Sequence, residues 1–239
     1  TTQKKKGDFM KQPLDYITKS LKVNRFLEEN KHGYNDRELE FIRSNWVHFL
    51  DKKFQVDILR QMYSELGFMD EKEDIYHAFI KILEENFDID TDIIEVGGGR
   101  IPSLAKRIAL KQKKGTITVY DPNLISTDSP YPNMVLRQQP FTLQTPVKED
   151  QLIIGFMPCE ATEKIIYNAK KNNAHFLIAL CEGGPHGDEF DYFESEDEWL
   201  SSMLYSARDI ANKTGHGPLQ MSDLKEFDDP YPVIYTKKR

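Results

Sequence analysis

A glycine-rich segment preceded by an acidic residue, running from Glu95 to Pro102, carries the clearest chemical signal in this sequence. It reads Glu-Val-Gly-Gly-Gly-Arg-Ile-Pro and separates a short apolar run from an amphipathic stretch at 103–113. Glycines allow a sharp turn that a ligand can approach closely, and the first turn of a following helix presents unpaired N–H groups to a carboxylate or phosphate. Pro102 suits that first turn, where its missing N–H costs nothing. The segment therefore predicts a ligand site between a strand and a helix.

Several ligand classes use a turn of this kind, and the residues around it narrow the choice. A nucleotide P-loop would end in Gly-Lys-Ser or Gly-Lys-Thr, which the segment lacks. The dinucleotide fingerprint G-x-G-x-x-G is matched at Gly97 and Gly99, but Pro102 stands at the third glycine position. Asp121 ends the next apolar run, about 20 residues beyond the turn, where an acidic side chain can accept hydrogen bonds from ribose hydroxyls. The turn and Asp121 together predict an adenosine-containing ligand without deciding between cofactors.

The order acidic residue, any residue, Gly, any residue, Gly at Glu95, Gly97 and Gly99 resembles the first motif of the class I S-adenosylmethionine (SAM)-dependent methyltransferases. The resemblance covers the architecture of residues 88–239, including a closing antiparallel pair of strands. It implies that Glu95 helps to position the methionine end of SAM, that the glycine turn packs against the cofactor and that Asp121 holds its ribose. The residues expected at the cofactor are Glu95, Gly97, Gly98, Gly99, Asp121, Pro122, Phe156 and, in the segment 138–141 that should border the adenine, Gln139.

The same resemblance places catalytic residues where the fourth apolar run ends, at 154–162. The Asp/Asn-Pro-Pro-Tyr/Phe motif of enzymes that methylate base amino groups is absent there, which argues against that chemistry. Pro158-Cys159 has the form of the dipeptide that supplies the thiolate nucleophile in cytosine C5 enzymes, but their Glu-Asn-Val motif is missing. Cys159 is otherwise a small residue at a strand-to-helix junction. Glu160 is a candidate general base, or an acidic residue that stabilises the first turn of a helix.

A second glycine-rich loop, at 181–187, follows the fifth apolar run and carries His186. Ligands of open α/β sheets bind at this edge, so His186 is a candidate acid, base or substrate contact, or else a surface histidine. The catalytic residue stays unassigned, with Glu160, His186 and Cys159 as candidates. The thiol and imidazole side chains near these loops could in principle bind zinc; they are Cys159, Cys181, His175 and His186. Their spacing matches no zinc motif, so no metal is expected.

Apolar runs alternate with amphipathic stretches over the C-terminal part of the chain. The runs that predict strands lie at 92–96, 116–121, 134–137, 151–156, 174–180, 219–224 and 232–235, and the predicted helices lie at 103–113, 162–172 and 196–213. Near-continuous apolar strands alternating with helices indicate a parallel sheet covered on both faces. The last two strands are joined by a turn-rich segment and indicate an antiparallel pair. We therefore predict an α/β fold with a Rossmann-like, mostly parallel seven-stranded sheet and an antiparallel C-terminal edge.

The N-terminal part predicts helices and no strand. Asn35 followed by Glu38 fits a capping box, and apolar residues at helical spacing follow over 39–66 and again over 75–83. We predict three regions, which are a disordered tail at 1–12, a helical cap subdomain at 13–87 and a methyltransferase-like Rossmann domain at 88–239.

The composition excludes several classes of protein. Of the 239 residues, 39% are hydrophobic and 30% are charged, with a net charge of −7. This balance is typical of a soluble globular protein, and broad nucleic-acid binding would require a basic chain. The basic run within 100–114 is typical of a solvated helix face. No apolar stretch is long enough to span a membrane, no signal core follows the polar N-terminus, and there are two cysteines, so we expect a cytoplasmic protein.

Three functions remain open from the sequence. The first is a small SAM-dependent methyltransferase, with SAM as its cofactor and an unknown methyl acceptor. The second is a non-catalytic binding or interaction protein on the same fold, since a fold does not fix a function. The third is an NAD(P)-binding oxidoreductase, which Pro102 and the lack of a Tyr-x-x-x-Lys pair disfavour. The sequence does not predict an oligomeric state.

Overall fold

The computed structural model describes residues 12–31, 34–46, 62, 65–66, 68, 75–129, 131–180, 196–214, 218–224 and 231–236. The chain divides into two compact units, Thr1–Met69 and Asp70–Arg239. The predicted tail lies outside the described residues except for its last residue, which begins the first helix.

The first unit contains the helices α1 (Gln12–Asn30) and α2 (Asp36–Asn45). Asn35 caps α2 as predicted, because its side chain accepts from the N–H of Glu38 at 3.0 Å while the Glu38 carboxylate accepts from the N–H of Asn35 at 2.9 Å. Helix α2 ends at Asn45, and most of the apolar run predicted to continue beyond Trp46 lies outside the described residues.

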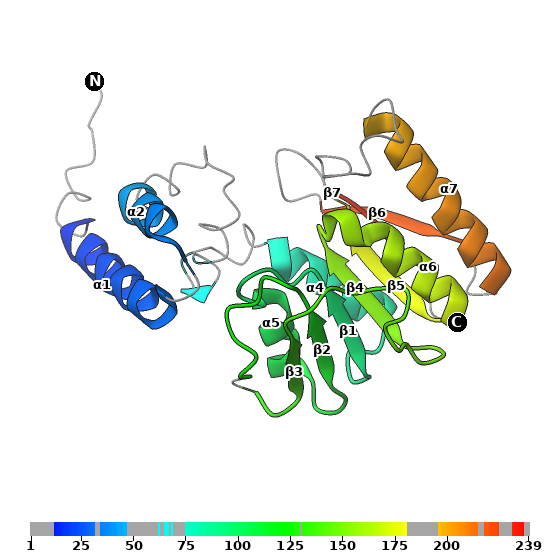
Figure 1. Cartoon of the computed structure of the whole chain (residues 1–239), viewed down its shortest axis with the longest axis horizontal. Helices are drawn as coiled ribbons and strands as arrows, with labels where there is room; N and C mark the ends of the chain where they lie inside the picture. Colours follow the sequence, from blue (N-terminus) through cyan, green and yellow to red (C-terminus); the bar gives the residue numbers. More distant parts are fainter. Residues whose placement is uncertain are drawn as a thin grey trace, which may run out of the picture. The chain divides into compact units, whose positions relative to one another are not determined.

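The second unit is built on one seven-stranded sheet (Figure 1). Its strands are β1 (Ile93–Val96), β2 (Ile117–Tyr120), β3 (Met134–Arg137), β4 (Leu152–Phe156), β5 (His175–Ala179), β6 (Gln220–Leu224) and β7 (Tyr231–Tyr235). They lie in the order β3-β2-β1-β4-β5-β7-β6; the first five are parallel, and β7 runs antiparallel to both β5 and β6. The structure confirms the predicted Rossmann-like sheet with its antiparallel C-terminal edge.

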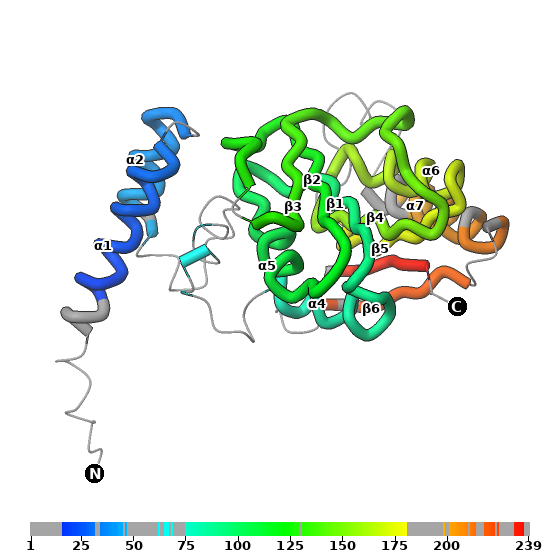
Figure 2. Tube along the Cα trace, turned by 90° about the horizontal axis from the view of Figure 1, so that it is seen from below, coloured from blue at the N-terminus to red at the C-terminus, as the bar shows by residue number. Residues whose placement is uncertain are grey.

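Helices cover both faces of the sheet, which explains why its central strands are apolar at nearly every position. Alternate residues of β1 separate the two faces, since Ile93 belongs to the core with α4 (Ile75–Asn86) and α5 (Ser103–Lys111), and Ile94 to the core with α6 (Thr162–Asn172) and α7 (Glu196–Thr214). Helices α6 and α7 lie side by side on their face (Figure 2).

Helix α4 was predicted as part of the N-terminal helical subdomain, and the structure corrects this. It belongs to the second unit, where Phe79 is fully buried against the sheet. The rings of Tyr76 and Phe79 contact that of Phe156 at the end of β4, with centroid distances of 5.0 and 5.5 Å. The physical reason is that the apolar face of α4 packs against one face of the sheet, in the same core as Ile93 of β1 and Ile154 of β4. The second unit therefore begins before β1.

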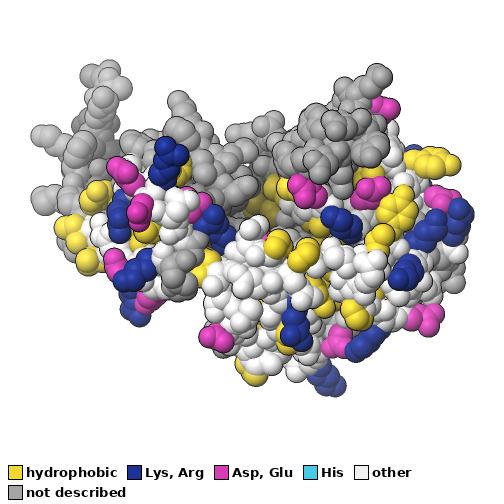
Figure 3. Space-filling model, in the orientation of Figure 1, with side chains coloured by type: hydrophobic (Ala, Val, Ile, Leu, Met, Phe, Trp, Pro, Cys, Tyr) yellow, Lys and Arg dark blue, Asp and Glu magenta, His cyan; other side chains and the backbone are white. Residues whose placement is uncertain are grey.

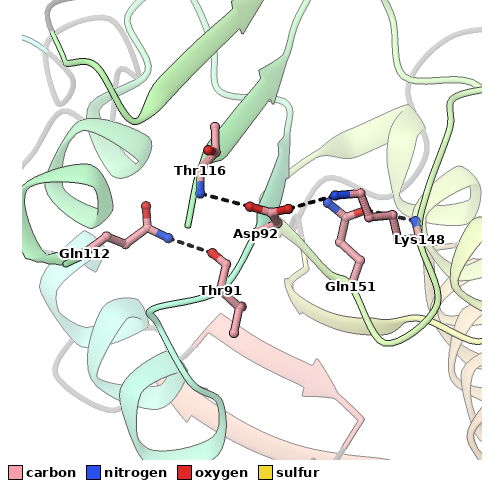
Figure 4. Close-up of polar contacts among 6 residues, drawn as sticks. All are labelled: Thr91, Asp92, Gln112, Thr116, Lys148 and Gln151. Carbon is pink, nitrogen blue, oxygen red and sulfur yellow. Dashed lines mark hydrogen bonds and ion pairs between the residues drawn. The ribbon is translucent and has the colours of Figure 1, made fainter. Parts of the chain in front are cut away.

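The amino-terminal edge of the sheet is closed by contacts within the protein (Figure 4). The Asp92 carboxylate accepts from the Thr116 N–H at 3.1 Å and from the Lys148 ammonium at 2.9 Å. The hydrogen bond from Lys148 lowers the pKa of Asp92. The Gln112 amide donates to the carbonyl of Thr91 at 2.9 Å. These polar groups at the amino-terminal edge are bonded to one another.

We expect Gln112→Ala to lower the free energy of unfolding of the second unit by about 1–3 kcal/mol. The buried Gln112 amide donates to two main-chain carbonyls, those of Ile89 at 2.8 Å and Thr91 at 2.9 Å, and alanine leaves both without this donor. Urea unfolding followed by circular dichroism measures the change. Lys114→Ala at a nearby exposed position is the control, and equal stability of the two variants would contradict the role of Gln112.

Candidate functional site

The glycine turn lies at the carboxyl-terminal edge of the sheet, directly after β1. Gly97 and Gly99 have φ angles of +78° and +71°, which glycine adopts without the steric cost of a side chain. The Gly97 N–H donates to the carbonyl of Tyr120 at the end of β2, at 3.0 Å. The turn is therefore fixed to the neighbouring strand at the edge where open α/β sheets bind ligands.

Close packing against the protein also requires glycine at two of these positions. A Cβ atom on Gly97 would lie 3.1 Å from Cα of Pro158, and one on Gly98 would lie 2.7 Å from Cγ1 of Val119. The sequence interpretation gave ligand approach as the reason for these glycines. The structure adds a packing reason, and it implies that a larger side chain at Gly97 or Gly98 disturbs the fold as well as any ligand.

Asp121 lies against the turn, as the sequence interpretation required. Its Oδ2 accepts from the Gly99 N–H at 2.8 Å, and its Oδ1 accepts from the Asn123 N–H at 2.7 Å. The residue is buried, with 6% of its surface exposed. A carboxylate oxygen can accept more than one hydrogen bond, so each oxygen keeps acceptor capacity for a hydroxyl group.

Glu95 lies in β1 between Val119 of β2 and Ile154 of β4, and it is 2% exposed. The N–H of Ala105 in the first turn of α5 donates to its carboxyl group. Within the described part of the chain, its Oε2 atom has no hydrogen-bond partner. Burial first, and the nearby charge of Asp121 second, raise the pKa of Glu95 to about 8. Two buried carboxyl groups thus flank one glycine turn.

The outer candidates occupy the loops that follow β2 and β3. Pro122 and Gln139 are exposed, and the Gln138 amide donates to the carbonyl of Leu124 at 2.8 Å, which joins the two loops. Phe141 is buried in the core with α6 and α7, where its ring contacts Tyr120 with centroids 5.7 Å apart. Pro122 and Gln139 are thus accessible to a ligand at this edge, whereas Phe141 is buried and packs in the core beneath the loop.

Phe156 ends β4 and was expected at the cofactor. It is largely buried, because Tyr76 and Phe79 of α4 pack against its ring. The guanidinium of Arg107 lies over the Tyr76 ring, 5.6 Å from its centroid. Sequence reasoning missed this aromatic group beneath the site, because it assigned α4 to another region of the chain.

The loop after β4 has an unusual backbone. Met157 and Cys159 have φ angles of +50° and +45°, on either side of the buried Pro158. Left-handed conformations of residues other than glycine cost free energy and concentrate at functional sites. The Cys159 thiol donates to the Met157 carbonyl at 3.4 Å, and Glu160 is exposed. The structure therefore places the candidates Cys159 and Glu160 at the same edge as the glycine turn.

Among the described residues, no other candidate is found at the carboxyl-terminal edge beside the glycine turn. His175 begins β5 opposite Leu152, at the amino-terminal edge, where its Nδ1 lies 3.1 Å from the Thr236 hydroxyl. Cys159 follows the far end of β4, so the zinc set that the sequence analysis considered is not assembled. No metal-binding cluster occurs among the described residues. The candidate His186 and Cys181 lie outside them.

The surface charge is mixed. On the face of the molecule shown in Figure 3, the described Lys and Arg side chains are interspersed with Asp and Glu side chains. In the basic run after the turn, Lys111 is paired with Glu84 at 2.8 Å. None of the helices in the described ranges is both long and apolar enough to cross a membrane.

Comparisons with known proteins return structural similarity only. No family model matches the chain, and no curated protein matches it. Among solved structures, it is similar to a magnesium protoporphyrin IX methyltransferase with bound SAM from Synechocystis PCC 6803, with 10% identity, a TM-score of 0.45, and coverage of 78% of this chain and 86% of that one. It is also similar to a precorrin-6y C5,15-methyltransferase from Geobacter metallireducens GS-15, with 12% identity, a TM-score of 0.46, and coverage of 70% and 89%. Human N-acetylserotonin methyltransferase in complex with SAM has 15% identity, a TM-score of 0.43, and coverage of 94% and 66%. At these identities and TM-scores, the similarity concerns the fold alone.

Proposed function

We propose that the second unit binds SAM at the glycine turn and transfers its methyl group to an acceptor. The observation that carries this proposal is the pair of buried carboxyl groups, Glu95 and Asp121, on neighbouring strands beside one turn. SAM carries a sulfonium and an ammonium group, both positively charged. Acidic groups at the turn favour such a ligand through direct electrostatic attraction.

Two other features, one at the turn and one in the sheet, disfavour a dinucleotide. Pro102, at the third position of the dinucleotide fingerprint, is buried before α5. The antiparallel β7 between β5 and β6 also departs from the fully parallel order of dinucleotide-binding sheets. These features support SAM over NAD(P).

Each group at the edge has a role under this proposal. Asp121 accepts hydrogen bonds from the ribose hydroxyls, and the turn with Glu95 faces the methionine end of the cofactor. Bound SAM supplies an activated methyl group, so the protein's main task is to hold the acceptor in line with it. The loop at Met157–Glu160 lies where the acceptor would meet the methyl group, and Cys159 and Glu160 are the candidates there for proton transfer or contact.

We expect saturating SAM to stabilise the protein, by about 2.7 kcal/mol at a concentration of one hundred times Kd. Differential scanning fluorimetry with SAM, S-adenosylhomocysteine (SAH) and NAD(P) separates the cofactor classes. Stabilisation by NAD(P) but not by SAM would overturn the proposed ligand.

Binding alone does not separate an enzyme from a non-catalytic binding protein. Incubation of the protein with SAM bearing a CD₃ group and a fractionated cell extract, followed by mass spectrometry, detects any labelled acceptor together with SAH. Stoichiometric SAM binding without SAH formation above the background would support the non-catalytic alternative.

A further inference from the structure

The buried pair at the glycine turn has an unequal supply of hydrogen-bond donors. Asp121 receives two backbone N–H groups, from Gly99 at 2.8 Å and from Asn123 at 2.7 Å. Glu95 receives the Ala105 N–H on its carboxyl group, and its Oε2 is buried without a partner among the described residues. Hydrogen bonds from N–H groups stabilise the ionised form of a carboxyl group, and burial without them favours the neutral form.

A single charge is therefore the stable arrangement for the pair, with the proton on Glu95, whose pKa is raised by burial. Both groups flank the turn, since Glu95 Oε2 lies 3.5 Å from the position of a Cβ atom on Gly98, and the next residue, Gly99, bonds to Asp121. Two ionised carboxylates buried beside the same turn repel each other, so one of them keeps its proton.

Other charged groups on the surrounding elements do not remove this conflict. The elements around Glu95 carry several titratable or charged side chains. Those described are Arg100 in the turn, Lys106, Arg107 and Lys111 on α5, Tyr76, His77, Lys81, Glu84 and Glu85 on α4, Tyr120 and Asp121 at the end of β2, and Cys159 and Glu160 after β4. Among them, Asp121 is the one whose charge acts on Glu95, and it acts in the same direction as burial.

We propose that Glu95 carries a proton when the site holds no cofactor and releases it when SAM binds. The inference rests on the proposed SAM site and adds a regulatory property to it. The positive sulfonium and ammonium groups of SAM, brought to the turn, stabilise the ionised form of Glu95. By linkage, a ligand that expels a proton binds more tightly as the pH rises.

The same coupling distinguishes SAM from its product. SAH has the same adenosine and amino-acid groups, but its sulfur is neutral after methyl transfer. SAH therefore stabilises the ionised Glu95 carboxylate less than SAM does. Fewer protons should be released per bound SAH than per bound SAM. Raising the pH therefore favours the binding of SAM over that of SAH.

Isothermal titration calorimetry tests the coupling directly. SAM is titrated into the whole protein at pH 7 in phosphate and in Tris, whose different ionisation enthalpies reveal the number of protons released. The comparison is between the wild type, Glu95→Gln, which resembles the protonated form, and Glu85→Gln, which makes the same charge change at an exposed position on α4. Because the α-amino group of the ligand also titrates near this pH, the difference between proteins is the relevant quantity.

We expect the wild type and Glu85→Gln to release close to one proton more per bound SAM than Glu95→Gln. Relative to the variant, the wild-type affinity for SAM should rise about tenfold between pH 7 and pH 9. The rise for SAH should be smaller. Equal proton release by all three proteins that bind SAM would overturn the inference. No SAM binding by the wild type would instead overturn the proposed function.

A measurement on the protein alone keeps the inference testable if Glu95→Gln does not fold. The free glutamate pKa is near 4.5, and burial raises it to about 8 in the folded protein. Between these values the unfolded chain has lost the proton and the folded protein keeps it, so this group makes the folded state less stable as the pH rises. NMR of protein labelled with ¹³C at the glutamate carboxyl carbons should show one carboxyl group that titrates near pH 8, and its ionisation at pH 7 on addition of SAM. Glutamate signals that all titrate below pH 6 would contradict the inference.

Discussion

Asp121→Ala is expected to weaken the binding of SAM by about 1–3 kcal/mol, which is roughly 5- to 150-fold in Kd. The substitution removes the acceptor proposed for the ribose hydroxyls. It also removes the acceptor of the Gly99 and Asn123 N–H groups, which hold the turn in place. The loss of affinity should therefore exceed that for cofactor analogues in which only the ribose hydroxyls are missing. Calorimetric titration of the wild type and the variant measures the effect.

The control for this substitution is Asp128→Ala. Asp128 is exposed in the loop that also contains Asp121, so its loss changes the net charge equally without altering the turn. We expect the affinity of Asp128→Ala to stay within about twofold of the wild type, since exposed charges contribute little. A folded Asp121→Ala protein that binds SAM as tightly as Asp128→Ala would remove Asp121 from the site.

Phe79→Ala should be the most destabilising of the substitutions considered, lowering the free energy of unfolding of the second unit by about 3–5 kcal/mol. Phe79 is fully buried on α4, and its ring contacts that of Phe156 at the end of β4. Removing it leaves a cavity between the helix and the sheet directly below the candidate site. Urea unfolding gives the change in stability.

Lys81→Ala is the matched control, because Lys81 is exposed on the same helix. Its stability should lie within about 0.5 kcal/mol of the wild type. If Phe79→Ala were no less stable than Lys81→Ala, α4 would not be part of the core of the second unit. If it were unstable but bound SAM normally once folded, the aromatic group beneath β4 would support the fold without shaping the site.

The architecture of the second unit could be predicted from the sequence because its signals are local. Strands covered on both faces are apolar at almost every position, as β1 and β4 are, and a glycine turn marks where β1 meets α5. The position of Asp121 at the end of the following strand predicted its approach to the turn, since the carboxyl ends of adjacent parallel strands meet at one edge. The capping box at Asn35 is likewise a local signal, and it was predicted correctly.

Features that depend on tertiary packing could not be predicted in this way. An amphipathic helix such as α4 shows that it buries one face but not which partner covers it, so its place against Phe156 was missed. The packing of Gly97 against Pro158 joins segments far apart in the chain. The left-handed backbone at Met157 and Cys159 has no sequence signal, because these residue types rarely adopt it.

A crystal structure of the protein soaked with SAM tests the central claim most directly. We expect density for the adenosine at the carboxyl-terminal edge of the sheet, with the ribose hydroxyls bonded to Asp121 and the methionine end beside the turn at 97–99. Density for the cofactor elsewhere, or an edge that stays closed by side chains at saturating SAM, would contradict the proposed function and leave only the fold.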